Sequence, residues 1–346
     1  MTCSERTARR ARLLAAGVLA AALVAPSADA HAGKRPDKQI KFATLAPDGS
    51  TWMKTMRAID GEVRRRTEGR LGFKFYPGGV QGDEKDVLRK IRIGQLHGGG
   101  FTGNGLGSIV SETRVLELPF LFEDLEELDH VREALAGYFD SAFDEQGYVL
   151  LGWTDVGFIY ILSQEPIHGP EDMNRQKMWV WSGDPLAEMF FKAFDISPIP
   201  ISAPDVLTSL QTGVIEAVYS SPLACVALQW YTRVRYMTDV PLTHGLGAAV
   251  VTRKALEGVS DADVQILRDV AAPQLRRLSL KTREQNVEAL SEIQKEGVEI
   301  VTVEKAVRDE FFRRGRAAWS DGVGTLYSQE LLDRVRALLA AYRGNP

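Results

Sequence analysis

Two tryptophans, Trp179 and Trp181, are the residues of this sequence whose type and spacing most suggest binding chemistry. They stand in the segment KMWVWSGDP, residues 177–185. Side chains alternate between faces along a strand, so both indoles should lie on one face. An indole face can stack on an aromatic ring or hold a cation, but tryptophans at this spacing are also common in packed cores. The spacing leaves two interpretations open, a core face and the wall of a binding site.

Motifs for bond-making chemistry are missing from the chain. The run GGGFTG, residues 98–103, matches the pattern G-x-G-x-x-G, but the acidic residue about 20 positions further on, Glu117, lies in an apolar run and not at the end of a strand in a nucleotide-binding unit. We expect these glycines to allow a close approach of the backbone to a cleft or a loop. No zinc-binding, catalytic-serine or Walker pattern occurs. We predict no enzyme, cofactor or metal site; a secreted enzyme on a two-lobed scaffold is the alternative class, because catalytic residues meet in space rather than in sequence.

The first thirty residues have the pattern of an export signal. Four arginines precede an apolar run from Leu13 to Val24, and small residues at 28–30 offer a cleavage site. The apolar run is too short to cross a bilayer core of about 30 Å. We predict a signal peptide over residues 1–30, cleaved near Ala30 or Ala32, and a mature protein in the periplasm that is not itself membrane-spanning.

Composition and charge narrow the class of protein further. The chain has 346 residues, enough for two domains, with 45% hydrophobic and 25% charged residues. Its formal net charge of −4 argues against a nucleic-acid partner. Cys3 would leave with the signal peptide, so Cys225 would remain without a cysteine to pair with.

Strands alternate with helices along the chain, which predicts an α/β fold with mostly parallel strand pairing. Segments 148–155 and 157–164 are close enough to form one strand that crosses the molecule. A helical pattern runs from Asp261 to about Glu296, or ~54 Å at 1.5 Å per residue. That length exceeds the ~30–40 Å of one domain, so we expect the helix to contact both halves of the protein.

Four segments, in order, resemble the solute-binding proteins of tripartite ATP-independent periplasmic (TRAP) transporters, of the dicarboxylate- and sialic-acid-binding type. They are YPGGVQGDEKDVLRKIRIGQL (76–96), LELPFLFED (116–124), PIHGPEDM with KMWVW (166–181) and LTSLQTGVIEA (207–217). The resemblance covers nearly the whole mature chain. It implies two α/β lobes with mixed, mostly parallel sheets around a hinge, and a long helix that spans both lobes.

The same resemblance implies a domain division and a function. Lobe I would hold residues 38–156 and about 245–283, lobe II residues 157–244 and about 284–325, and a C-terminal helix residues 326–346. A small-molecule ligand would be enclosed between the lobes and handed to the membrane permease subunits of the transporter. A sensor that binds a ligand but serves no permease is a further alternative.

The positions that hold the ligand in the family are altered in this chain. The family arginine on the strand after the motif P-x-DLKG, which binds the ligand carboxylate, corresponds to Trp179, and a second usual arginine corresponds to Ile159. Ser220 and Tyr219 stand for the family's Asn and Glu, and Ala203 stands for an aromatic residue. Arginine presents a planar fork that matches a carboxylate, whereas tryptophan offers a π-face and one donor.

These exchanges change the expected class of ligand. Burying an ionised carboxylate without an excellent partner costs several kcal/mol, whereas burying a large apolar group gains about 1.5–3 kcal/mol. We therefore predict a neutral, aromatic, lipid-like or cationic ligand rather than a simple dicarboxylate. We expect Trp179→Ala to abolish binding and to leave the stability of the ligand-free protein nearly unchanged.

Other candidate ligand contacts follow from position along the chain. The alternative is a receptor that binds a carboxylate ligand through Lys177, two residues before Trp179, or through another cation. His97 borders the glycine run and is either a cleft residue or a polar strand end. The remaining candidates come from the first strand–helix turn, the end of the glycine run and the hinge crossing: Trp52, Phe101, Thr102 and Phe158.

Overall fold

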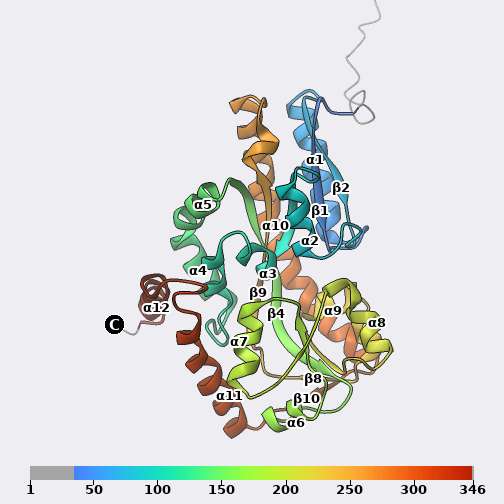
Figure 1. The fold of residues 1–346 in the computed structure, drawn as a ribbon, viewed down its shortest axis with the longest axis vertical. Coiled ribbons are helices and arrows are strands. Elements are labelled where there is room, and N and C mark those ends of the chain that lie inside the picture. The colour runs from blue at the N-terminus through green and yellow to red at the C-terminus, as the bar shows by residue number, and fades with distance from the viewer. Residues whose placement is uncertain (1–34, 345–346) are drawn as a thin grey trace, which may run out of the picture.

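The computed structural model describes residues 35–344, which fold into two α/β lobes (Figure 1). The predicted signal peptide lies outside the described residues. The strands are β1 (Lys38–Thr44), β2 (Leu71–Tyr76), β3 (Gly98–Thr102), β4 (Tyr148–Ser163), β5 (Trp179–Trp181), β6 (Ile199–Ile201), β7 (Ala217–Ser220), β8 (Tyr236–Thr238), β9 (Thr243–Thr252) and β10 (Glu299–Val301).

The helices cover both faces of these strands. They are α1 (Thr51–Arg66), α2 (Glu84–Arg92), α3 (Gly103–Gly107), α4 (Leu125–Ala134), α5 (Ala136–Glu145), α6 (Pro170–Asn174), α7 (Pro185–Ala193), α8 (Val206–Gln211), α9 (Pro222–Ala227), α10 (Asp261–Lys295), α11 (Lys305–Ala317) and α12 (Gln329–Tyr342). Short 3-10 helices are η1 (Ser111–Glu117), η2 (Ala203–Asp205), η3 (Trp230–Arg233), η4 (Arg253–Leu256) and η5 (Ala318–Gly322). No helix within residues 35–344 is long and apolar enough to cross a membrane.

Local sequence explains where the first helices begin. Ser50 caps α1 because its side chain accepts a hydrogen bond from the backbone N–H of Met53. Buried apolar side chains then recur every three or four residues along α1, so one face packs on the sheet. Asp83 and Asp86 form a capping box at the start of α2, which holds this helix end in place beside the cleft described below.

The main sheet joins the two lobes. Its strand order is β10-β8-β4-β9-β3-β1-β2, with β7 also paired to β4. Lobe I is built on β1, β2 and β3, and lobe II on β7, β8 and β10 with the separate β5–β6 pair. The pairs β1–β2, β1–β3, β8–β10 and β5–β6 are parallel, whereas β3–β9, β4–β9, β4–β7 and β4–β8 are antiparallel.

The sheets are therefore mixed, as predicted, but parallel pairs do not predominate among the described strands. The reason is that β4 and β9 cross between the lobes side by side in opposite directions. The two apolar segments around residues 148–164 do form a single strand, β4. Its pairing with β9 shifts register at Gly152 and Gly157. Gly157 has φ +114°, and a Cβ there would lie 2.4 Å from the Asn286 amide of α10.

Helix α10 is the longest element and confirms the predicted helix that spans both lobes. Its 35 residues correspond to about 52 Å. It packs against α1 in lobe I, along β4, and against α9 in lobe II (Figure 1). Near the C-terminus, α12 packs on α4 and η1. The lobes are thus tied together by two strands and one helix rather than by a flexible linker.

Candidate ligand-binding site

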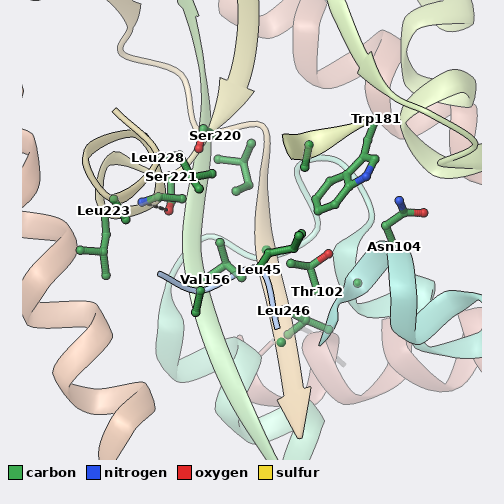
Figure 2. A pocket seen from close by; sticks show the side chains of 18 of the residues that line it. Leu45, Thr102, Asn104, Val156, Trp181, Ser220, Ser221, Leu223, Leu228 and Leu246 are labelled. Atoms are coloured by element: carbon green, nitrogen blue, oxygen red, sulfur yellow. Dashed lines mark hydrogen bonds between the residues drawn. The ribbon is translucent and has the colours of Figure 1, made fainter. Parts of the chain in front are cut away.

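A pocket of about 730 Å³ lies between the two lobes (Figure 2). Lobe I contributes the segments after β1 and β3, and lobe II contributes β5, the end of β7 and helix α9. The crossing strands β4 and β9 form the remaining side. Pockets of about 300–1,000 Å³ are typical of small-molecule sites, so this one can hold a small organic molecule.

One side of the pocket is an aromatic wall, formed by Trp179, Trp181, Tyr219 and Trp230 of lobe II. Trp179 is only 1% exposed and donates from Nε1 to the Ile201 carbonyl at 3.0 Å. Its ring stacks on Tyr219 with 4.8 Å between centroids. Trp179 thus belongs to the core of lobe II and contributes one part of its surface to the pocket, whereas Trp181 is only partly buried.

Trp181 also connects the two lobes. Its Nε1 donates to Asp83 Oδ2 of lobe I at 2.9 Å, and the backbone N–H of Ala203 donates to the same oxygen at 3.3 Å. Next to this bridge, Lys85 of lobe I lies against Gly183 of lobe II, where an added Cβ would meet the lysine Nζ. The lobes therefore touch at one edge of the pocket, as in a closed binding protein.

The glycine run lies on the lobe I side and behaves as a close-approach segment. A Cβ at Gly100 would lie 2.3 Å from the ring of Trp52, so only glycine lets this indole rest against β3. Phe101 is buried in the lobe I core, and Thr102 ends the strand at the pocket. Both the backbone N–H and the hydroxyl of Thr102 donate to the carboxyl group of Glu84.

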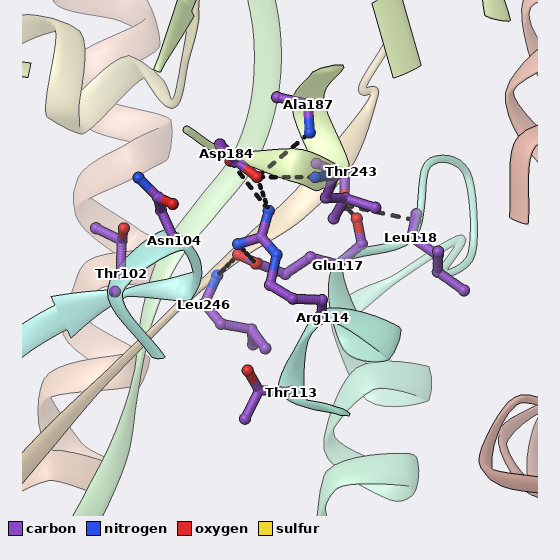
Figure 3. A network of polar contacts seen from close by, with 12 residues as sticks. Thr102, Asn104, Thr113, Arg114, Glu117, Leu118, Asp184, Ala187, Thr243 and Leu246 are labelled. Carbon is purple, nitrogen blue, oxygen red and sulfur yellow. Dashed lines mark hydrogen bonds and ion pairs between the residues drawn. The ribbon is translucent and has the colours of Figure 1, made fainter. Parts of the chain in front are cut away.

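A buried ionic cluster near this strand end joins the lobes (Figure 3). Arg114 Nη1 donates to Glu117, and Arg114 Nη2 donates to Asp184 of lobe II at 2.8 Å. Burial alone would lower the pKa of Arg114, but the charges of Asp184 and Glu117 outweigh it and raise that pKa. Glu117 also accepts the Leu246 backbone N–H at 2.8 Å. Burial raises the pKa of Glu117, and the charge of Arg114 acts in the opposite direction. Both carboxyl groups hold the one guanidinium, which is not free to bind an anion.

We call Glu84, Asn104, Arg114 and Glu117 the polar wall of the pocket. Burial raises the pKa of Glu84 to about 8, although hydrogen bonds from Thr102 and Gly105 act in the opposite direction. Asp155, also in the lining, forms ion pairs with Arg132 at 2.8 Å and Arg283 at 2.6 Å. The lining contains four carboxyl groups and two cationic side chains, of which Lys54 is exposed on α1.

Nine of the twelve predicted site residues lie together in the pocket lining. They are Trp52, Phe101, Thr102, Ile159, Trp179, Trp181, Ala203, Tyr219 and Ser220. Trp179 and Ile159, which the resemblance to the family predicts to replace two arginines, are among them. Ligand contact by each of the nine stays a prediction, because a lining position is necessary for contact but does not establish it.

His97, Phe158 and Lys177 lie outside the lining. His97 precedes β3, roughly 16 Å from Thr102 at about 3.3 Å per residue, and its Nδ1 bonds the backbone near Gln39. Phe158 lies on the face of β4 opposite Ile159 and packs edge-on against His244. Lys177 precedes the short strand β5, so the alternation from Trp179 does not extend to it.

Lys177 is instead held on the surface of lobe II. Its Nζ pairs with Glu216 at 3.0 Å and donates to the Gly213 carbonyl at 2.9 Å. The lysine side chain is 52% exposed. This placement removes the geometric basis for Lys177 as the partner of a carboxylate ligand in the pocket.

The polar wall is what sequence reasoning missed. Its residues are scattered from position 84 to position 117, and their partner Asp184 lies 70 residues beyond Arg114. The spacing of Arg114 and Glu117, three residues apart, was the one local signal of an ion pair. Asn104 stands inside the glycine-rich segment TGNG, which contains no pattern that points to a ligand.

Known proteins resemble this chain over most of its length. The profile of the DctP family, "Bacterial extracellular solute-binding protein, family 7", matches residues 42–323. A solute-binding protein of Chromohalobacter salexigens is 27% identical over 63% of this chain and 65% of its own length. The ectoine-binding periplasmic protein TeaA of Halomonas elongata is 26% identical over 57% of this chain and 59% of its own.

A solved structure shares the fold. It is a TRAP periplasmic solute-binding protein from Xanthobacter autotrophicus Py2 with bound β-D-galacturonate, and it superimposes with a TM-score of 0.80. The match covers 87% of this chain and 99% of that one at 20% identity. The predicted two-lobed binding-protein fold is confirmed. Since the family profile covers most of the chain, the protein belongs to the DctP family of bacterial extracellular solute-binding proteins, which are receptors and not enzymes.

Proposed function

We propose that this protein is the periplasmic receptor of a TRAP transporter, which captures a small organic molecule between its lobes and delivers it to the membrane permease. TRAP solute-binding proteins are periplasmic, and their pocket lies between two lobes, as it does here. An export signal cleaved near Ala30 or Ala32 would bring the chain to that compartment. Closure of the lobes around the ligand is the capture mechanism.

The ligand we propose is neutral, aromatic, lipid-like or cationic rather than a simple dicarboxylate. The observation that carries this proposal is the state of Arg114, the guanidinium in the pocket lining, whose charge Glu117 and Asp184 already balance. Trp179 and Ile159 occupy the positions of the family arginines and offer apolar surface instead. A carboxylate in this pocket would lose its hydration without gaining a bidentate partner.

Lys54 is the competing possibility for an anionic ligand. It lies in the pocket lining on α1, and its side chain reaches solvent. An exposed ammonium is screened by water and salt, so it contributes less than a buried guanidinium clamp. The Lys54→Met variant separates the two proposals. If the wild-type protein binds a carboxylate and this variant does not, the ligand is an anion, and the proposal of a neutral or cationic ligand is wrong.

Native mass spectrometry of the protein purified from its own periplasm tests the proposal directly. We expect a bound molecule that is released on denaturation and that carries no net negative charge. The Ile159→Arg variant is the complementary test, because it restores a guanidinium at one family position and should introduce measurable affinity for small carboxylates. Recovery of a dicarboxylate from the wild-type protein would refute the proposed ligand class.

A further inference from the structure

Two residues of the polar wall carry buried polar atoms that have no hydrogen-bond partner. They are Asn104, through both Nδ2 and Oδ1, and Arg114, through Nε. The other unpartnered buried side-chain atoms among residues 35–344 belong to residues outside the pocket lining: Thr238, His244, Ser279 and Arg308. Buried polar groups are normally paired, so orphaned donors and an acceptor together in one pocket wall point to a missing polar partner.

The backbone that carries Asn104 is fixed in place. Glu84 accepts the backbone N–H of Thr102 at 2.6 Å and that of Gly105 at 2.7 Å, one on each side of Asn104. The carboxylate of Glu117 lies so close to Gly103 that an added Cβ would be 1.6 Å from its Oε2. These contacts hold the backbone of α3 in position on both sides of Asn104. The side-chain torsions of Asn104 are what remains free to change.

Asn104 also lies next to the aromatic wall. Trp181 donates to Asp83, and the adjacent Glu84 accepts from the backbone of Thr102 and Gly105, on either side of Asn104. In Figure 2 the labelled side chains of Asn104 and Trp181 lie toward the same side of the pocket. A ligand whose apolar body lies against Trp181 can thus present its polar end to Asn104. Asn104 is 6% exposed with both amide atoms shielded, so its side chain has to turn toward the pocket to meet that end.

The free atoms define the chemistry of that polar end. Asn104 offers N–H donors and one carbonyl acceptor, whereas Arg114 Nε belongs to a guanidinium that Glu117 and Asp184 hold in place. A carboxylate has no donor for Oδ1. An ammonium group has no acceptor for Nδ2. A group with a carbonyl oxygen beside an N–H satisfies both kinds of atom.

We infer that Asn104 recognises an uncharged amide-type head group, such as a carboxamide or a lactam, on a ligand whose apolar body lies on the aromatic wall. This inference rests on the proposed receptor function and narrows its ligand class. A site built to hydrogen-bond such a group discriminates strongly against analogues that lack it, because its own buried polar atoms are then left unpaired.

Three probes with one apolar body test this inference by calorimetry: 4-phenylbutanamide, 4-phenylbutanoate and 4-phenylbutylammonium. We expect the wild-type protein to bind the amide at least tenfold more tightly than either charged probe. Asn104→Leu, of similar volume, should weaken amide binding at least tenfold and change the binding of the charged probes less than twofold. The ligand-free Asn104→Leu protein should melt no lower than the wild type, because the substitution removes unpaired buried atoms.

Several results would overturn the inference. They are equal or tighter binding of a charged probe, failure of the wild type to bind the amide, an amide preference that survives in Asn104→Leu, or a melting temperature lowered by several degrees in that variant. Failure of the receptor function itself has a different signature. In that case the protein purified from the periplasm contains no small molecule, and none of the three probes raises the melting temperature of the wild type.

Discussion

The two walls of the pocket differ in how much of their chemistry is already satisfied. On the aromatic wall, Trp179 is packed against Tyr219 and Trp230, and its indole N–H is bonded to a backbone carbonyl. On the polar wall, Asn104 and Arg114 retain three unpaired polar atoms. An apolar surface whose polar atoms are all hydrogen-bonded contributes affinity in proportion to the area that the ligand buries on it. Unpaired polar atoms instead favour ligands that can hydrogen-bond to them over ligands that cannot. The contrast assigns affinity to one wall and selectivity to the other.

Removing the central tryptophan of the aromatic wall should have the largest effect. Trp179→Ala is expected to lower the free energy of unfolding of the ligand-free protein by about 3–5 kcal/mol, because it opens a cavity in the lobe II core. This revises the expectation from sequence that ligand-free stability would hardly change. Urea unfolding checks it, with the partly buried Trp181→Ala as the matched control. Equal losses in the two variants would contradict the distinction between core and rim.

The polar wall should make stability depend on pH near neutrality. Burial raises the pKa of Glu84 from 4.5 to about 8, so between these values the folded state holds a proton that the unfolded state has lost. Stability is therefore fully present below the unfolded pKa and falls as pH rises toward 8. Between pH 6.5 and 8 the expected loss from this group is roughly 2 kcal/mol.

Glu84→Gln should remove the share of Glu84 from that slope, whatever its effect on stability at any single pH. Burial lowers the pKa of His244 from 6.5 to about 4. The pH dependence of stability that His244 adds therefore lies mainly between these two values, below the window of this experiment. Urea unfolding of both proteins at pH 6.5, 7.2 and 8 measures the difference in slope. The same slope in the variant and in the wild type would show that Glu84 does not titrate in this range.

The bridge between the walls should have a smaller effect. Trp181→Phe removes the donor to Asp83 Oδ2 and keeps an aromatic ring, which weakens the contact between the lobes by about 1 kcal/mol. We expect the ligand-free protein to shift toward an open form, with a larger radius of gyration in small-angle X-ray scattering. Trp153→Phe, which changes an indole away from this bridge, is the control. Unchanged scattering for Trp181→Phe would mean that the Asp83 contact does not hold the lobes together.

The smallest effect is expected at the surface of lobe II. Lys177→Met breaks an exposed ion pair with Glu216, for which a change in stability of about 0–1 kcal/mol is typical. It should leave the affinity for 4-phenylbutanamide within twofold of the wild-type value, as measured by calorimetry. A tenfold loss of affinity would show that Lys177 takes part in ligand binding. It would contradict the assignment of affinity to the aromatic wall and selectivity to the polar wall.

Most of the fold could be predicted from the sequence because its helices and strands are determined by local sequence patterns. The capping residue Ser50, the strand segments now joined in β4 and the length of α10 all follow from signals within one element. The predicted excess of parallel strand pairing was not found, because the direction in which β4 and β9 cross is not encoded in either strand alone.

For the site, the sequence by itself determined the family and the absence of arginine at positions 159 and 179. Only the tertiary structure decided which side chains share the pocket. His97, Phe158 and Lys177 lie outside the pocket lining. Phe158 is on the opposite face of β4, where it packs against His244, and Lys177 pairs with Glu216 on the surface.

The tertiary structure also places Arg114 next to Asp184, which lies 70 residues further along the chain, and leaves the Asn104 side-chain amide without a hydrogen-bond partner. Pairing between distant segments and the burial of a polar atom depend on how the lobes pack, and no periodicity within one element records that packing.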